Sequence, residues 1–148
     1  MIKRLPHYLH LETDENLSQR PFWMEDIKPH LNKLSVNQAA KISDYMKLAP
    51  KIMEWMGVIK DPMDPSNYIG TSEYSDGFFA WEEIHIHYVR KYRVDPPQTF
   101  IDHIEQYNGN FEHLNLLDKN IIKKEMKRIY VNENGASVAD DLTVRIGY

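Results

Sequence analysis

The sequence predicts a predominantly α-helical α+β fold, a helical bundle with a small antiparallel hairpin or sheet beside it. Apolar residues recur at helical spacing in several segments, an Asp-Gly pair stands between two short apolar runs, and strand-like alternation is confined to a few short stretches. The 148 residues, with 42% hydrophobic and 27% charged side chains, suffice to bury one core. We therefore expect a single globular domain over residues 1–148.

The N-terminal segment combines two kinds of pattern. Residues 8–11 alternate as in an edge strand or an irregular arm, and residues 22–24 supply a cluster of large apolar side chains. Apolar residues at helical spacing follow, but Pro29 interrupts them. We expect a helix that starts near Lys28 or is kinked there.

The next segment carries a clear helix start. Ser35 and Gln38 have the spacing of a capping box, in which each side chain satisfies a backbone N–H in the first turn. This helix is expected to run to Leu48. Its predicted buried face consists of Val36, Ala39, Ala40 and Met46. After Pro50 an apolar pattern resumes and predicts a short second helix over residues 51–56.

The middle of the chain predicts a loop followed by a hairpin. Residues 61–67 contain two prolines among Asp, Ser and Asn, which set turns and remove backbone donors. Asp76-Gly77 stands between the apolar runs 68–71 and 78–81, and Asp-Gly favours a tight hairpin because both residues tolerate positive φ. We expect the two runs to pair as antiparallel strands.

The segment after this hairpin predicts a helix. Apolar and aromatic residues recur at helical spacing over 82–92, and acidic residues occupy its first turn, where the helix dipole favours them. A half-buried strand over 84–89 is the rival, because apolar residues alternate there with His85 and His87. Of the two, the helix is the prediction that we retain.

The last third of the chain predicts two helices and one strand. One helix begins at Pro97 and ends before Asn108-Gly109, and a basic helix covers residues 119–130. Their apolar stripes are Phe100, Ile104 and Tyr107 in the first and Ile122, Met126 and Ile129 in the second. Residues 142–146 alternate like a strand that could pair with the hairpin.

Charge is unevenly distributed along the chain. The net charge is -4, but residues 71–118 hold nine acidic and three basic side chains, and residues 119–130 hold five basic side chains and one acidic one. A surface that binds nucleic acid carries a dominant basic face, which this pattern lacks. We therefore expect no nucleic-acid partner, and a partner protein that is basic.

Several kinds of chemistry have no signal in the sequence. It contains no cysteine, no glycine-rich phosphate-binding motif and no GxSxG nucleophile motif. It also lacks the apolar run of a signal peptide and the roughly 18 apolar residues of a spanning helix. We expect a cytoplasmic protein with no cofactor and no membrane partner.

Four histidines fall between residues 85 and 113, which raises the question of a metal site. Metal ligands on a helix stand three or four residues apart, whereas His85 and His87 are two apart and point to different faces. We therefore predict no metal site. The alternative is a small metal-dependent or hydrolytic enzyme that uses the His and Glu residues of 82–103, chiefly His85, His87, His103 and Glu83.

Three short motifs follow one another between residues 76 and 104. They are Asp76-Gly77 with Trp81, His87-Tyr88-Val89 with Val94, and Pro97 with Phe100 and His103-Ile104. Over these roughly 30 residues the chain resembles a family of uncharacterised bacterial proteins, some of which look like immunity proteins of toxin systems. The resemblance implies a non-enzymatic inhibitor that docks on a toxin domain, and it carries over no catalytic residue.

The leading hypothesis from the sequence is a non-enzymatic protein-binding domain of the immunity type. Its acidic middle segment would meet a basic partner by electrostatic complementarity. The residues predicted to bind are Tyr74, Asp76, Trp81, Glu82 and Glu83. Beside the small enzyme, a third hypothesis is a structural subunit that buries its aromatic surface in a homodimer.

Overall fold

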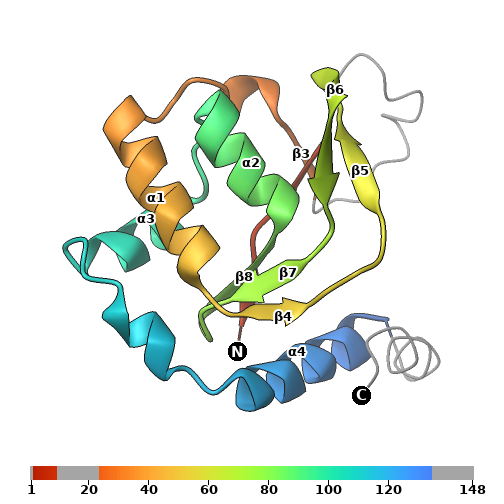
Figure 1. Cartoon of the computed structure of the whole chain (residues 1–148), viewed down its shortest axis with the longest axis vertical. Coiled ribbons are helices and arrows are strands. Elements are labelled where there is room, and N and C mark those ends of the chain that lie inside the picture. The colour runs from red at the N-terminus through yellow and green to blue at the C-terminus, as the bar shows by residue number, and fades with distance from the viewer. Residues whose placement is uncertain (1, 10–23, 135–148) are drawn as a thin grey trace.

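The structure, a computed structural model, describes residues 2–9 and 24–134 (Figure 1). Its α-helices are α1 Val36–Leu48, α2 Glu83–Tyr92, α3 Gln98–Glu105 and α4 Lys119–Asn134, and its short 3-10 helices are η2 Lys28–His30 and η3 Glu112–Leu116. Its strands are β1 Lys3–Arg4, β2 His7–Leu9, β3 Met24–Asp26, β4 Lys51–Met53, β5 Val58–Asp61, β6 Asp64–Gly70, β7 Glu73–Ser75 and β8 Phe79–Glu82.

Four strands form a central mixed sheet in the order β1-β8-β7-β4. β1 runs parallel to β8, whereas the β8-β7 and β7-β4 pairs are antiparallel. The antiparallel β5-β6 hairpin and the parallel β2-β3 pair lie outside this sheet. The expectation of a predominantly helical bundle is therefore wrong, and the fold is α+β with helices packed on a sheet. Most of these strands have only two to four residues, which is too short for an alternation of apolar and polar residues to be recognised. A prediction from apolar periodicity therefore underestimates the strand content.

Successive residues of β8 point to opposite faces of the central sheet and meet different helices. Trp81 packs in the larger core with residues of α1, α2 and α3, whereas Ala80 lies in a smaller core with Ile122 and Met126 of α4. Figure 1 shows α4 below β4, away from α1 and α2. A third apolar cluster places Ile69 of β6 against α2.

Local signals placed several elements correctly. The Ser35 hydroxyl accepts a hydrogen bond from the Gln38 N–H, and the Gln38 side-chain oxygen accepts one from the Ser35 N–H, which completes the capping box of α1. The Asp76-Gly77 turn forms a hairpin as predicted, with Gly77 at a φ of 90°, but the strand that pairs with β8 is β7 and the predicted partner run 68–71 was wrong. Residues 68–70 belong to β6 and pair with β5, because so short a turn brings together only the residues next to it. Residues 84–89 are helical, as predicted, and α3 and α4 also lie where the sequence predicts helices.

The buried face of α1 differs from the predicted one. Its buried residues are Ala39, Ile42, Ser43, Tyr45 and Met46. The prediction was wrong for Val36, which is 68% exposed, and for Ala40, which is also exposed. These two residues line an open groove beside α2. The buried face of α1 is therefore turned about the helix axis relative to the face that the apolar pattern predicts.

Three other segments differ from the prediction. The segment near Lys28 forms a single turn of 3-10 helix, and β4 occupies the first half of 51–56 instead of a helix. The predicted loop 61–67 belongs mostly to the β5-β6 hairpin, whose turn is Pro62-Met63. Strand pairing of β4 with β7 and of β5 with β6 overrides the local pattern in the last two cases.

Some predicted features lie outside the described residues, namely the strand at 142–146, residues 22–23 and the second half of the 8–11 stretch. The first half of that stretch belongs to β2, which pairs with β3. In the described part of the chain, no helix combines the length and apolar character needed to cross a membrane.

Candidate functional site

The residues predicted to bind a partner lie close together, but the aromatic ones are not on the surface. Tyr74 and Trp81 are paired directly across β7 and β8, and both are buried. Trp81 Nε1 donates a hydrogen bond to the carbonyl oxygen of Met46 at 3.1 Å. Aromatic side chains buried in this way stabilise the core and offer no contact surface.

Asp76 is buried at the tip of the β7-β8 hairpin, where both oxygens of its carboxylate accept hydrogen bonds. Oδ2 accepts from the Tyr45 hydroxyl at 2.6 Å and from His103 Nε2 at 2.8 Å. Oδ1 accepts from the backbone N–H groups of Phe78 and Phe79. Burial and the nearby carboxylate raise the pKa of the Tyr45 hydroxyl. Asp76 therefore joins α1, α3 and the hairpin inside the fold.

Glu82 and Glu83 stand at the start of α2 and are half-buried. The backbone N–H of Glu82 donates to His85 Nδ1 at 2.9 Å, which closes a capping box. Burial raises the pKa of Glu82, an effect that neighbouring Arg4 reduces. The Glu83 carboxylate fills the space that a side chain at Gly70 would need. Of the predicted acidic contacts, these two keep partial access to solvent.

The histidines named for an enzyme do not converge on one site. Their partners are the carbonyl oxygen of Pro6 for His85, Asp61 for His87 and Asp76 for His103. Within residues 2–9 and 24–134, no three His, Cys, Asp or Glu side chains are placed to hold a metal ion. Each of the three histidines that the enzyme alternative combines with Glu83 is thus held by a different acceptor.

His113 is partly buried, with its ring packed against aromatic residues of the larger core. Its ring stacks on Tyr107 with centroids 3.7 Å apart. Among the described residues, neither ring nitrogen has a hydrogen-bond partner, and both are buried. Burial lowers the pKa of His113. A charged imidazole would be poorly solvated there, so the neutral form is favoured.

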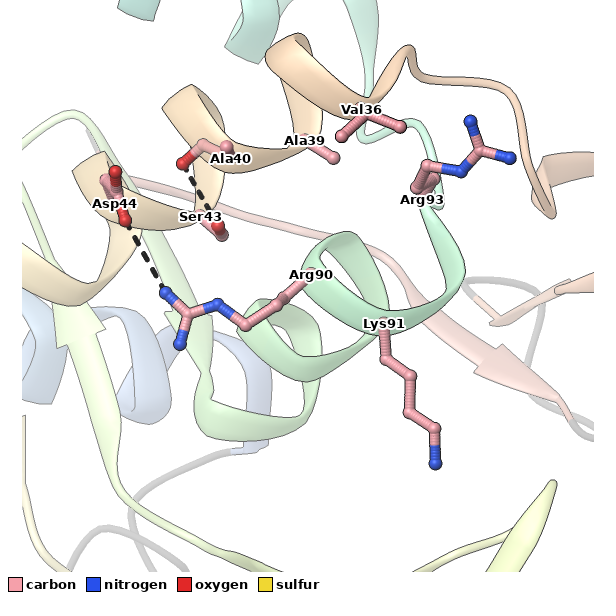
Figure 2. A pocket seen from close by; sticks show the side chains of 8 residues that line it. All are labelled: Val36, Ala39, Ala40, Ser43, Asp44, Arg90, Lys91 and Arg93. Atoms are coloured by element: carbon pink, nitrogen blue, oxygen red, sulfur yellow. Dashed lines mark hydrogen bonds and ion pairs between the residues drawn. The ribbon is translucent and has the colours of Figure 1, made fainter.

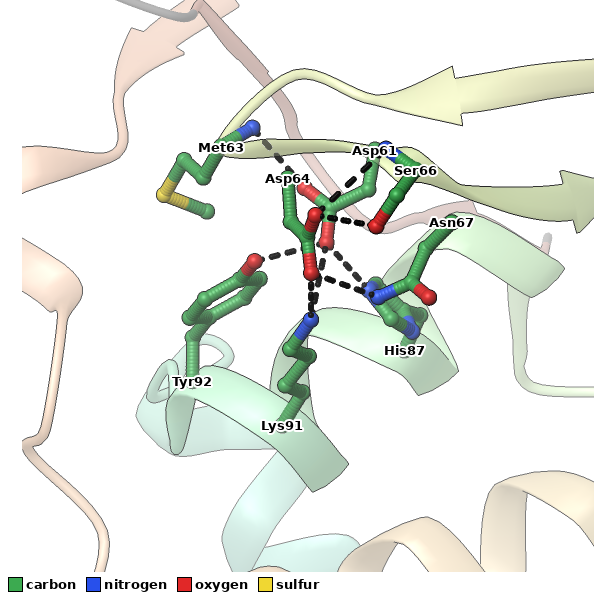
Figure 3. Close-up of polar contacts among 8 residues, drawn as sticks. All are labelled: Asp61, Met63, Asp64, Ser66, Asn67, His87, Lys91 and Tyr92. Carbon is green, nitrogen blue, oxygen red and sulfur yellow. Dashed lines mark hydrogen bonds and ion pairs between the residues drawn. The ribbon is translucent and has the colours of Figure 1, made fainter.

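A second buried carboxylate, that of Asp61, ties the β5-β6 hairpin to α2 (Figure 3). Its Oδ2 accepts hydrogen bonds from His87 Nε2 at 2.7 Å and from the Tyr92 hydroxyl at 2.6 Å. Asp64, on the other side of the turn, accepts a hydrogen bond from Lys91 Nζ at 2.9 Å. We call these five residues the Asp61 clamp.

The clamp could not be predicted from the sequence because its members come from two distant segments. Lys91 follows His87 by four positions and shares its face of α2, and Tyr92 is the next residue, at the end of the helix. Asp61 Oδ1 also accepts a hydrogen bond from the Met63 N–H, the pattern of an Asx turn. The sequence does show Asp61 and Asp64 at the spacing of a turn. It does not show that the partners of Asp61 lie 26 and 31 positions further along the chain.

The hydrogen bonds of the clamp keep its carboxylates ionised. Burial on its own would raise the pKa of Asp61, but hydrogen bonds, first among them the one from Tyr92, outweigh burial and hold the pKa below its ordinary value. Hydrogen bonds from Ser66 and Lys91 lower the pKa of Asp64 to about 2. At neutral pH the clamp is therefore a charged, hydrogen-bonded joint.

Replacing Asp61 with alanine should lower the free energy of unfolding by about 2 kcal/mol, because two donors lose their acceptor. Since the pKa of Asp61 is depressed in the fold, its contribution is present above the ordinary carboxyl pKa and is lost as the pH falls through the lowered value. In urea denaturation, the difference between wild type and variant should thus stay constant from neutral pH down to the ordinary carboxyl pKa of about 4 and shrink below it. Hydrogen exchange should quicken first in β5 and β6.

Asp44→Ala is the matched control for this variant. Asp44 is an exposed carboxylate that lies 3.5 Å from Arg90, and its loss should change stability by about 0.5 kcal/mol or less. Equal losses for the two variants, or exchange that quickens evenly over the whole chain, would contradict the role of the clamp.

The β5-β6 hairpin carries exposed apolar side chains. Val58 is 59% exposed and Tyr68 is 63% exposed, and Met56 and Ile59 are also exposed. Lys60 pairs with Tyr68 across the hairpin, and its Nζ lies 5.9 Å from the centre of the ring. Apolar side chains grouped on one element are typical of a contact surface. The strand register places Val58 and Tyr68 on the same face of the hairpin and Ile59 on the opposite face with Ile69, whereas Met56 precedes β5. We call Val58 and Tyr68 the hairpin patch.

An open groove of about 300 Å³ lies between α1 and α2 (Figure 2). Its lining residues are Val36, Ala39, Ala40, Ser43 and Asp44 from α1, and Arg90, Lys91 and Arg93 at the end of α2. None of the residues predicted to bind from the sequence lines this groove.

Comparisons with known proteins add no family to this picture. No family model, curated protein or solved structure matches the chain. The family suggested by the motifs between residues 76 and 104 therefore stays a prediction, and the functional inference rests on the clamp and the hairpin patch.

Proposed function

We propose that this chain is a non-enzymatic protein-binding domain that contacts its partner through the hairpin patch. The supporting observation is the exposure of Val58 and Tyr68 on one face of a hairpin that the Asp61 clamp holds in place. Apolar surface that a partner covers contributes about 25 cal/mol per square ångström, from which the cost of association is subtracted. Tyr68 also provides an aromatic ring of the kind that dominates interface hot spots.

The hairpin is ordered before a partner arrives. A two-stranded hairpin on its own is marginally stable in water. Here Ile69 packs against α2 and the clamp fixes the turn end, so the patch has a rigid support. A preorganised surface loses little conformational entropy on binding, which favours affinity.

The proposal extends to the class of partner and the compartment. Because the motifs between residues 76 and 104 resemble proteins that include immunity-type inhibitors, we take the partner to be a toxin domain and the compartment to be the bacterial cytoplasm. A basic partner was expected from the acidic segment, of which Glu82 and Glu83 remain half-exposed. An apolar contact resists salt, whereas a contact through these carboxylates weakens as salt rises.

The test compares a hairpin variant with a matched variant elsewhere on the surface. The tagged chain captures its partner from the native host, and the affinity for the purified partner is then measured. Val58→Ser combined with Tyr68→Ser should weaken binding at least about tenfold with little change in stability, because both side chains are exposed. Leu116→Ser, at a side chain that is 87% exposed on another element, should bind like the wild type.

Two outcomes would contradict the proposal. One is an equal loss of affinity in the Leu116→Ser control, and the other is unchanged affinity in the hairpin variant. If binding instead weakens with salt and with Glu82→Gln combined with Glu83→Gln, while the hairpin variant still binds, the acidic contact predicted from the sequence is the correct one.

A further inference from the structure

The turn that follows α3 contains an Asn-Gly pair at the surface. Asn108 and Gly109 are both exposed, and both adopt positive φ, of 51° and 81°. Asparagine and glycine enter this left-handed region more readily than other residues, which explains their place where the helix ends. The turn lies between α3 and η3, at the edge of the molecule (Figure 1).

This pair places a side-chain amide next to a nucleophile of the backbone. The peptide nitrogen of Gly109 is separated from Cγ of Asn108 by only a few bonds, so its attack on that carbon is an intramolecular reaction that closes a small ring. A Cβ on the residue that carries the nitrogen would hinder the approach, and glycine has none. Whether the reaction occurs in the folded chain depends on what holds the two groups.

The described part of the chain holds neither group. The N–H groups on either side of Gly109 are bonded, that of Asn108 to the Glu105 carbonyl at 3.1 Å and that of Asn110 to the Tyr107 carbonyl at 3.0 Å, but the Gly109 N–H donates no hydrogen bond there. The Asn108 side chain has no hydrogen bond there either. A carbon added at Gly109 would meet no heavy atom within 4 Å. Rotation about the Cα–C bond of Asn108 can therefore bring the nitrogen to Cγ.

Asn110, two positions further on, lacks these features. Its side-chain oxygen accepts a hydrogen bond from the Glu112 N–H at 3.2 Å. The residue that follows it is Phe111, whose ring packs against the larger core and whose Cβ hinders attack by its own nitrogen. The same turn thus contains an asparagine open to attack and one that is protected, which gives an internal control.

We propose that Asn108 is a site of spontaneous modification, at which its amide is lost through a cyclic imide. The Gly109 nitrogen gives up its proton and bonds to Cγ, and the side-chain nitrogen takes up a proton and leaves as ammonia. Water then adds to one of the two imide carbonyls and breaks its bond to the ring nitrogen. Opening at Cγ gives aspartate, and opening at the main-chain carbonyl gives isoaspartate, in which the backbone runs through the former side chain.

The modification would change the turn in two ways. Both products add a carboxylate between Glu105 and Glu112, within the acidic segment of the chain. Isoaspartate also lengthens the backbone between Tyr107 and His113, whose rings stack in the structure. This inference rests on the turn alone and is independent of the proposed function.

The test is incubation of the purified full chain at neutral and at mildly alkaline pH, followed by digestion and mass spectrometry with electron-transfer fragmentation, which distinguishes isoaspartate from aspartate. We expect Asn108 to lose its amide, with isoaspartate among the products, at a rate within about tenfold of that in a synthetic peptide of residues 105–112. The rate should rise with pH, because the attacking nitrogen must lose its proton. Asn110 should react at least about tenfold more slowly than Asn108.

Asn108→Gln is the matched control. Its side chain is one carbon longer and closes a larger ring, so position 108 should stay unmodified, and the variant should fold as the wild type does because the position is exposed. The proposal is overturned if Asn108 keeps its amide while Asn134, which also precedes a glycine, loses it. It is also overturned if Asn108 reacts more than about tenfold more slowly than in the peptide, if aspartate forms without isoaspartate, or if Asn110 reacts as fast.

Discussion

Alanine in place of Asp76 is expected to lower the free energy of unfolding by about 4 kcal/mol. The change leaves the Tyr45 hydroxyl and the backbone N–H groups of Phe78 and Phe79 without an acceptor in the interior. His103 also loses its carboxylate partner. Each buried donor left unpaired costs about 1 to 3 kcal/mol. Urea denaturation followed by tryptophan fluorescence measures the loss.

Asp102→Ala is the matched control for this variant, since Asp102 is an exposed carboxylate on α3 that accepts a hydrogen bond from Gln98. Its stability should stay within about 0.5 kcal/mol of the wild type. Asp76→Asn should recover part of the loss, because an amide oxygen still accepts from the backbone. If Asp76→Ala keeps its stability and loses affinity for the captured partner, Asp76 belongs to the binding surface instead.

Trp81→Ala is expected to destabilise the fold by a similar amount, about 4 kcal/mol. The indole is almost fully buried and contacts the rings of Tyr45 and Phe100. Its removal leaves a cavity between the sheet and the helices and also deletes the hydrogen bond to the Met46 carbonyl. Because this variant lacks one tryptophan, the loss of stability is measured by thermal unfolding followed by circular dichroism.

Phe78→Ala serves as the aromatic control, because Phe78 lies in the neighbouring turn and is 60% exposed. Its removal should cost about 1 kcal/mol or less. A Trp81→Ala protein as stable as Phe78→Ala would mean that the indole contributes little to the core, and would favour the reading of Trp81 as a contact residue.

The parts of the fold that could be predicted depend on neighbours in the sequence. The capping box of Ser35 and Gln38 and the turn at Asp76-Gly77 each involve residues within four positions, so the sequence contains the whole interaction. The helix at 83–92 was also predicted correctly, because its apolar and aromatic residues recur at helical spacing.

The parts that could not be predicted depend on distant partners. Lys51–Met53 is a strand because β7 lies beside it, although its apolar residues fit a helix equally well. Asp61 links the hairpin to α2 by accepting hydrogen bonds from Tyr92 and His87, and only the tertiary fold brings these residues close to it. Asp76 looks the same in a sequence whether it is exposed or buried, so acidic composition alone could not show that its charge is used inside the protein.

The parallel pairing of β1 with β8 also determines the order in which the chain can assemble during synthesis. Lys3 pairs with Phe79, so β1 leaves the ribosome long before its partner strand is made. Ile2 and Leu5, which flank β1, belong to separate apolar cores, and docking of this one strand completes both. A nascent chain must therefore keep these residues available, and exposed to chaperones and proteases, until β8 has emerged.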